Sequence, residues 1–121
     1  MTLERHLAAL EARSLAPGLT ILVAGDRRAR ARGLARLDSL PPDHALLFER
    51  CRSVHTAGMR FALDLLWLDR DGALLRLDGA VAPLRLRTCL RARSVLEANA
   101  GCGERFAEAL AQARPAISRA G

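Results

Sequence analysis

The stretch CRSVHTAGMRFALD, residues 51–64, places several kinds of reactive side chain close together. Cys51, His55 and Met59 follow one another at intervals of four residues, and Asp64 then falls in an apolar run. A thiol, an imidazole and a thioether together suit a soft metal such as Cu(I). A thiol near an imidazole and a carboxylate could instead be a nucleophile with its base. The third alternative is the lining of a small core, because Cys and Met are often buried.

The surrounding residues weaken the first two alternatives. A metal site would need one short segment to supply all three ligands, and no second His or Cys lies nearby to complete the set. An enzyme would need a recognised nucleophile turn and an oxyanion donor, and neither accompanies Cys51. The sequence therefore predicts no metal and no other cofactor. An enzyme that uses Asp64, His55 or Cys51 remains the alternative function.

Asp64 is the most informative of these residues, because its neighbours in the apolar run would make an unpaired carboxylate costly. It must accept hydrogen bonds, pair with an arginine or line a cleft. In a regular strand Arg60 shares its face and is the first candidate partner, followed by Thr56 and His55. Glu97 raises the same question more weakly, since it can face solvent. The candidate ligand contacts are His55, Thr56, Arg60 and Asp64.

The composition indicates one domain over residues 1–121, with half of the residues apolar and a net charge of +6. All nineteen basic residues are arginines, which a codon-biased, GC-rich genome explains more simply than selection at each position. The charge could attract nucleic acid, but readers of single strands and RNA also need aromatic platforms. The chain has no Tyr, one Trp and three Phe. An arginine-driven nucleic-acid module is therefore only the second alternative.

The sequence also predicts a cytoplasmic protein that does not enter a membrane. No run of about 18 apolar residues is present. The N-terminal segment contains Glu4 and Glu11 and lacks the cationic and apolar regions of a signal peptide. The whole chain has three cysteines, an odd number, and no CxxC pair, so we expect neither a disulfide framework nor a zinc knuckle.

The elements that must position the candidate site are mostly strands. Asp71-Gly72 suits a turn with positive φ, so it predicts a hairpin. Residues 61–68 are apolar on both faces, as in a central strand covered on both sides. Over 51–63, a strand or a helix would gather the same side chains, with a bend at Gly58. We expect strands at 19–25, 44–49, 61–68, 73–78, 83–88 and 94–98, helices at 2–13 and 102–113, and a basic helix or turn at 26–37.

This pattern predicts a mainly β protein. We expect a compact β-sandwich or partly open barrel of five to seven short strands, with peripheral N- and C-terminal helices. The function that fits it best is a small binding module for an unknown small molecule or protein, with a pocket formed by residues 51–64.

Two stretches, CRSVHTAGMRFALDLLWLDRDGALLRL and RARSVLEANAG, resemble family 192 of the domains of unknown function, a widespread prokaryotic group. The resemblance covers about residues 30–105. The chain departs from the family pattern at Ala57, where an aromatic is usual, at Ala62, where Pro is usual, and at Ala98-Asn99. The resemblance implies a compact, mostly β domain and a candidate surface, without a reaction. The matching positions are Cys51, Ser53, Val54, His55, Thr56, Gly58, Met59, Arg60, Asp64, Leu68, Asp69, Gly72, Val95, Leu96, Glu97, Ala100 and Gly101.

Overall fold

The computed structural model describes residues 10–25, 39–57 and 59–120. In these ranges the protein is mainly β, with eight strands and one C-terminal helix, which confirms the predicted fold class. There are more strands than the five to seven expected, and within the described ranges they form no closed barrel. The elements are β1 (Glu11–Ala16), β2 (Leu19–Gly25), β3 (His44–Glu49), β4 (Ser53–His55), β5 (Leu63–Leu68), β6 (Leu74–Val81), β7 (Leu86–Thr88), β8 (Ser94–Asn99) and α3 (Gly103–Ala120).

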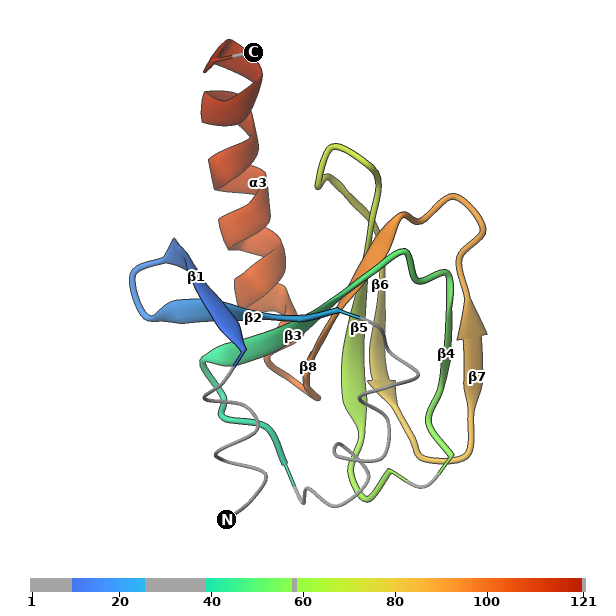
Figure 1. Cartoon of the computed structure of the whole chain (residues 1–121). Helices are drawn as coiled ribbons and strands as arrows, with labels where there is room; N and C mark the ends of the chain where they lie inside the picture. Colours follow the sequence, from blue (N-terminus) through green and yellow to red (C-terminus); the bar gives the residue numbers. More distant parts are fainter. Residues whose placement is uncertain (1–9, 26–38, 58, 121) are drawn as a thin grey trace.

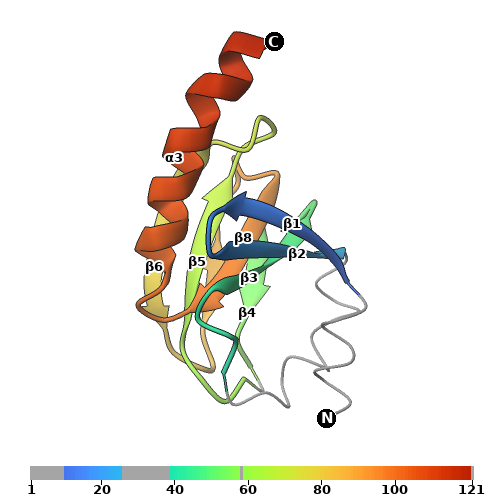
Figure 2. The ribbon, with the colours of Figure 1, turned by 90° about the vertical axis from the view of Figure 1, so that its left-hand side faces the viewer.

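The main layer is a six-stranded sheet in the order β1-β2-β3-β8-β5-β6. β2 and β3 run parallel, whereas the other neighbouring pairs run antiparallel. All six residues of β5 are buried, because α3 covers one face of the sheet and the small sheet of β4 and β7 lies on the other side (Figures 1 and 2). This arrangement confirms the predicted central strand.

Each face of the large sheet has its own core. On the helix side, Phe106 of α3 packs with Leu66 and Leu96. On the side of the small sheet, Val54 of β4 belongs to one buried cluster with Trp67 of β5. Because side chains alternate across a strand, Leu66 and Trp67 enter opposite cores although they are adjacent in sequence.

The predicted helix at 2–13 is wrong at its C-terminal end, where residues 11–13 belong to β1. Its earlier part and the basic segment at 26–37 lie outside the described residues. Pro17-Gly18 is the turn of a hairpin, with Gly18 at φ 79°, and β1 pairs antiparallel with β2. Helical spacing of apolar residues does not reveal this pairing, because the hydrogen-bond partners come from another strand.

The predicted hairpin at Asp71-Gly72 is confirmed, since it joins β5 to β6 and Gly72 has φ 82°. The carboxylate of Asp69 accepts hydrogen bonds from the amides of Asp71 and Ala73, at 2.8 and 2.9 Å. The predicted C-terminal helix is also confirmed, and α3 extends beyond it to Ala120. No helix in the described part of the chain is long and apolar enough to cross a membrane.

Candidate functional site

Asp64 is a buried carboxylate whose hydrogen bonds all join it to the backbone. Its side chain accepts from the amides of Ala80 at 2.8 Å, Gly101 at 2.9 Å and Gly103 at 2.8 Å. The residue is 4% exposed, and Gly103 is the first residue of α3. The carboxylate therefore lies at the positive end of the helix, where an anion is stabilised. Asp64 thus connects β5, β6 and the start of α3.

Thr56 belongs to a different network. Its fully buried hydroxyl donates to the carbonyl of Ala82 at 2.7 Å and accepts from the amide of Arg85 at 2.8 Å. Its own amide donates to the carbonyl of Arg85 at 2.9 Å. These bonds connect the end of β4 to the chain that enters β7. The structure therefore does not bring Thr56 and Asp64 together as one hydrogen-bonded pair.

The remaining reactive residues of the 51–64 segment separate between core and surface. β4 includes only residues 53–55 of it, so the segment is neither one long strand nor a helix. Cys51 and Met59 are buried in the core cluster below the small sheet, whereas His55 and Arg60 are exposed. The thiol, imidazole and thioether therefore do not converge. Within the described ranges, no group of three or more His, Cys, Asp or Glu could hold a metal ion.

Glu97 corrects another expectation, because it does not face solvent. It is fully buried, in β8 between β3 and β5, opposite Leu46 on one strand and Leu65 on the other. Val95 lies two residues before Glu97 and is also fully buried, so the two side chains share one face of β8, and that face is turned to the core.

The 51–64 segment does contribute to a hollow, which we call the arginine hollow. It has a volume of about 470 Å³ and is lined by Arg50, Arg52, Ser53 and Arg93. Arg50 follows β3, Arg52 and Ser53 lie at the start of β4, and Arg93 precedes β8. The backbone holds these segments together, since the amide of Cys51 donates to the carbonyl of Arg93 at 3.1 Å.

The side chains of the arginine hollow are partly fixed. Arg52 Nε donates to the carbonyl of Ala92 at 3.2 Å, and Ser53 Oγ shares a hydrogen bond of 2.9 Å with Thr88 Oγ1. Arg50 has φ 55°, in the left-handed region that residues other than glycine rarely adopt. Among the described residues, arginine forms ion pairs at Arg13–Glu11 and Arg76–Asp78 and not in this hollow. Within the described residues, the three arginines that line the hollow therefore form no ion pair with a carboxylate.

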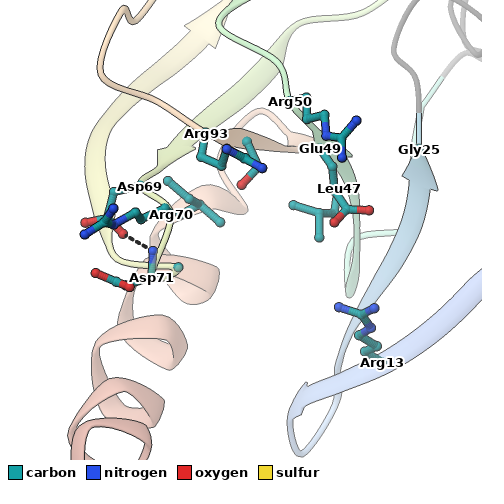
Figure 3. A pocket seen from close by; sticks show the side chains of 12 residues that line it. Arg13, Gly25, Leu47, Glu49, Arg50, Asp69, Arg70, Asp71 and Arg93 are labelled. Carbon is teal, nitrogen blue, oxygen red and sulfur yellow. Dashed lines mark hydrogen bonds between the residues drawn. The ribbon is translucent and has the colours of Figure 1, made fainter. Parts of the chain in front are cut away.

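A larger groove of about 1120 Å³, the hairpin groove, shares Arg50 and Arg93 with the arginine hollow. It lies between the turn that joins β5 to β6 and the strands β1 and β2 (Figure 3). Leu47 and Leu68 give it an apolar part. The arginine hollow and the hairpin groove therefore offer cationic and apolar surface side by side. The other charged residues that line the groove are Arg13, Glu49, Asp69, Arg70 and Asp71.

The hollow's arginines were not among the predicted ligand contacts, although a signal for them exists in the sequence. Residues 50–63 and 79–96 contain seven of the nineteen arginines and none of the thirteen acidic residues. A codon bias explains the choice of arginine over lysine, but it does not explain why acidic residues are absent from these two segments. They are the segments that contain β4 and β7.

A polar network joins the small sheet to the large one. Asp78 accepts hydrogen bonds from Trp67 Nε1 at 2.9 Å and from Arg76 at 2.9 and 2.8 Å. Arg76 also donates to the carbonyl of Thr88 at 2.8 Å. Burial acts to raise the pKa of Asp78, but the hydrogen bonds from Arg76 and Trp67 and the Arg76 charge leave that pKa below its usual value.

Comparisons with known proteins agree with the fold. A crystal structure of a candidate transcription regulator from Sinorhizobium meliloti 1021 is 28% identical, with a TM-score of 0.62, over 73% of this chain and 74% of that chain. A protein of unknown function from Novosphingobium aromaticivorans is 18% identical, with a TM-score of 0.63, over 73% and 68% of the two chains, which shows a likeness of fold alone.

No curated protein matches this chain. The family pattern of DUF192, described as "Uncharacterized ACR", matches residues 10–108. This range contains every described strand and the first turns of α3. The chain therefore belongs to the DUF192 family.

Proposed function

We propose that this protein is a binding module for a small anionic ligand, with the arginine hollow as the site of the anionic group. One observation carries the proposal: Arg50, Arg52 and Arg93 line one hollow together with a serine and no carboxylate. A guanidinium is a planar, permanently charged donor that matches phosphate and carboxylate groups with paired hydrogen bonds. Three of them in one hollow suit a ligand with more than one negative charge.

The local structure supports binding in two further ways. The hydrogen bond from Arg52 to Ala92 limits the motion of one guanidinium, which reduces the entropy lost when a ligand is bound. The positive φ of Arg50 is a strained conformation that turns the chain between β3 and β4, and such strain often occurs at functional sites.

The adjoining hairpin groove suggests what else the ligand carries. Leu47 and Leu68 lie in the same groove as Arg93, so an apolar portion can extend from an anionic group held in the hollow. Ligand pockets typically combine apolar walls with a few well-placed polar groups. The proposal retains the predicted binding module and takes Arg52 and Ser53 from the 51–64 segment as its contacts. Asp64 and Thr56 act as structural supports.

The test is binding of inorganic phosphate, pyrophosphate and citrate, measured by thermal unfolding and calorimetry. A ligand that binds only the native state raises Tm. We expect at least one of these anions to raise Tm beyond sodium chloride of equal ionic strength, which screens charge equally. Arg52→Gln and Arg93→Gln should each weaken binding by about tenfold or more, equivalent to about 1.4 kcal/mol.

The matched control is Arg105→Gln, which removes an exposed arginine of α3 outside the hollow. It should bind as the unmodified protein does. The proposal is wrong if none of the three anions exceeds the sodium chloride effect, or if Arg93→Gln and Arg105→Gln bind equally well.

A further inference from the structure

Three adjacent strands supply part of the floor of the hairpin groove. Ser94 of β8 lies opposite Glu49 of β3 on one side and opposite Leu68 of β5 on the other. Residues paired in this way direct their side chains to the same face of a sheet, with Cβ atoms about 4.5–5.5 Å apart. All three line the groove, and we call them the floor row. A carboxylate, a hydroxyl and an aliphatic side chain therefore follow one another across the sheet.

The aliphatic part of the groove is backed by the core beneath α3. Leu68 is buried in that core, and Leu47 packs against it. Leu47 lies two residues before Glu49 on β3, so the two side chains share a face. In Figure 3, residues 69–71 of the hairpin lie across the groove from Leu47 and Glu49. The core thus fixes the position of an apolar strip beside the floor row.

The arginine hollow adjoins the floor row directly. Arg50 follows Glu49 in the sequence, and Arg93 precedes Ser94. Both arginines line the hollow as well as the groove. A ligand whose anionic group is held by both arginines therefore extends into the groove past Glu49 and Ser94.

Glu49 restricts what the rest of the ligand is made of. Its side chain is exposed, and within the described ranges its carboxylate forms no ion pair. The nearby Arg13 is paired with Glu11 at 2.6 Å. That hydrogen bond and the charge of Glu11 are the main causes that raise the pKa of Arg13, and the charge of Glu49 contributes less. The Glu49 carboxylate can therefore accept hydrogen bonds from a ligand.

Three kinds of organic group differ in how they match this carboxylate. An alkyl chain would remove water from Glu49 without replacing its hydrogen bonds, which is costly. An ammonium group would pair with Glu49, but the like charges of Arg50 and Arg93 would oppose it. Neutral hydroxyl groups donate to a carboxylate and carry no charge for the arginines to repel. A hydroxylated carbon skeleton therefore fits best, with donors for Glu49 and Ser94 and an apolar face for Leu68.

We propose that the ligand is a sugar phosphate, with its phosphate in the arginine hollow and its sugar on the floor row. The sugar hydroxyls donate to Glu49, as ribose does to an acidic residue in dinucleotide-binding folds. The groove has a volume of about 1120 Å³, so the same chemistry describes a free sugar phosphate and the ribose phosphate of a nucleotide. This inference rests on the proposed function, because it names the ligand of that same anion site.

The test compares phosphates with different organic parts by calorimetry at constant ionic strength. The ligands are ribose-5-phosphate, adenosine monophosphate, n-butyl phosphate, phosphoethanolamine and inorganic phosphate. We expect the better of the two sugar phosphates to bind about tenfold or more tightly than each of the other three. Tighter binding of adenosine monophosphate identifies a nucleotide site, and tighter binding of ribose-5-phosphate identifies a site for the free sugar phosphate.

Glu49→Ala separates hydrogen bonding from charge, because the two effects have opposite signs. Loss of a negative charge beside Arg50 should tighten the binding of inorganic phosphate. Loss of the hydroxyl acceptor should weaken the binding of ribose-5-phosphate by about tenfold or more. Glu49→Gln keeps a carbonyl acceptor and should weaken it less. The matched control is Glu108→Ala, which removes an exposed carboxylate of α3 outside the groove and should bind both ligands as the unmodified protein does.

Two results would overturn the sugar phosphate without touching the anion site. One is binding of n-butyl phosphate or phosphoethanolamine as tight as that of both sugar phosphates. The other is a Glu49→Ala protein that binds ribose-5-phosphate and inorganic phosphate more tightly alike. In either case anion binding still depends on Arg93, so the proposed function stands. The proposed function itself fails by a different result, in which inorganic phosphate, pyrophosphate and citrate all match the sodium chloride effect.

Discussion

At the scale of single residues, Asp64 shows how a buried charge is made compatible with a core. Removing a carboxylate from water is costly unless hydrogen bonds replace its hydration. Three backbone amides do so here, those of Ala80, Gly101 and Gly103. Gly103 allows the backbone to approach, because a Cβ there would lie 2.8 Å from Asp64 Cβ, whereas Gly101 supplies a positive φ of 91°. Asp64 therefore holds β6 and the start of α3 against β5.

Asp64→Ala should lower the free energy of unfolding by about 3 kcal/mol or more, because each stranded buried donor costs about 1–3 kcal/mol. Urea denaturation followed by circular dichroism measures the change. Asp71→Ala is the control, since Asp71 is exposed at the hairpin turn, and it should change stability by less than about 0.5 kcal/mol. Equal losses in the two variants would contradict a structural role for Asp64.

The lowered pKa of Asp78 predicts how the stability of the protein changes with pH. Its pKa lies below the usual value in the folded protein, so its stabilising contribution is present above the unfolded pKa of about 3.9. That contribution is lost as the pH falls through the folded pKa. We expect the difference in unfolding free energy between the unmodified protein and Asp78→Asn to shrink steadily below about pH 4. A difference that stays constant from neutral pH to about pH 2.5 would contradict this coupling.

At the scale of elements, the start of α3 is matched to the strand beneath it. Gly103 is buried, and a Cβ there would also lie 2.8 Å from Asp64 Oδ2 and 3.0 Å from Leu77 Cδ1. In an ordinary helix, Ala is more favourable than Gly by about 1 kcal/mol. Here the clash involves Asp64 Cβ, which cannot move without moving β5.

Gly103→Ala should therefore destabilise the protein, by about 1–3 kcal/mol, although helix propensity alone predicts the opposite sign. The free energy of unfolding in urea tests it. Ala111→Gly, at an exposed position of α3, is the reference for propensity alone and should cost about 1 kcal/mol. A stabilised Gly103→Ala protein would show that the start of α3 is not packed as closely as described.

The hairpin between β5 and β6 depends on backbone conformation. Gly72 has φ 82°, and a Cβ there would meet no atom within 4 Å. Gly72→Val should lower stability by about 1–2 kcal/mol through strain alone, since β-branched residues resist positive φ. Gly72→Asn should cost less, because Asn tolerates the left-handed region. Equal losses in these two variants, in thermal or urea unfolding, would point to a cause other than φ.

At the scale of the whole molecule, charge is unevenly distributed. The small sheet and its flanking loops hold seven arginines without an acidic residue, whereas all thirteen acidic residues lie elsewhere in the sequence. The proposed anion site lies in this cationic part. A positive field attracts anions and raises association rates, but it does not choose among them. Selectivity must come from the positions of the side chains that line the arginine hollow.

Binding to nucleic acids tests whether positive charge alone is enough for recognition. We expect duplex and single-stranded oligonucleotides to bind weakly at low salt and not detectably at about 150 mM salt, because base-stacking platforms are missing. Fluorescence anisotropy over a salt series measures this dependence. A sequence-selective complex with submicromolar affinity at about 150 mM salt would instead establish nucleic-acid recognition.

The sequence by itself determined the features that depend on neighbouring residues. The runs at 19–25 and 44–49 coincide with β2 and β3, because apolar and β-branched composition acts within the strand itself. The turn at Asp71-Gly72 and the start of the last helix near Gly103 are equally local. The family motif in residues 51–64 was recognisable for the same reason.

Only the tertiary structure decided which distant groups meet. The amides of Gly101 and Gly103 lie 37 and 39 residues from Asp64, and no periodicity indicates that pairing. Two separate segments, residues 50–53 and Arg93, bring the arginines of the hollow together, and strand pairing makes β1 from residues that suggested a helix. The burial of Glu97 in β8 and the exposure of Leu86 in β7 follow from which strands are central and which lie outside. Sheet order sets these outcomes, because hydrogen bonds between strands are made across the chain and not along it.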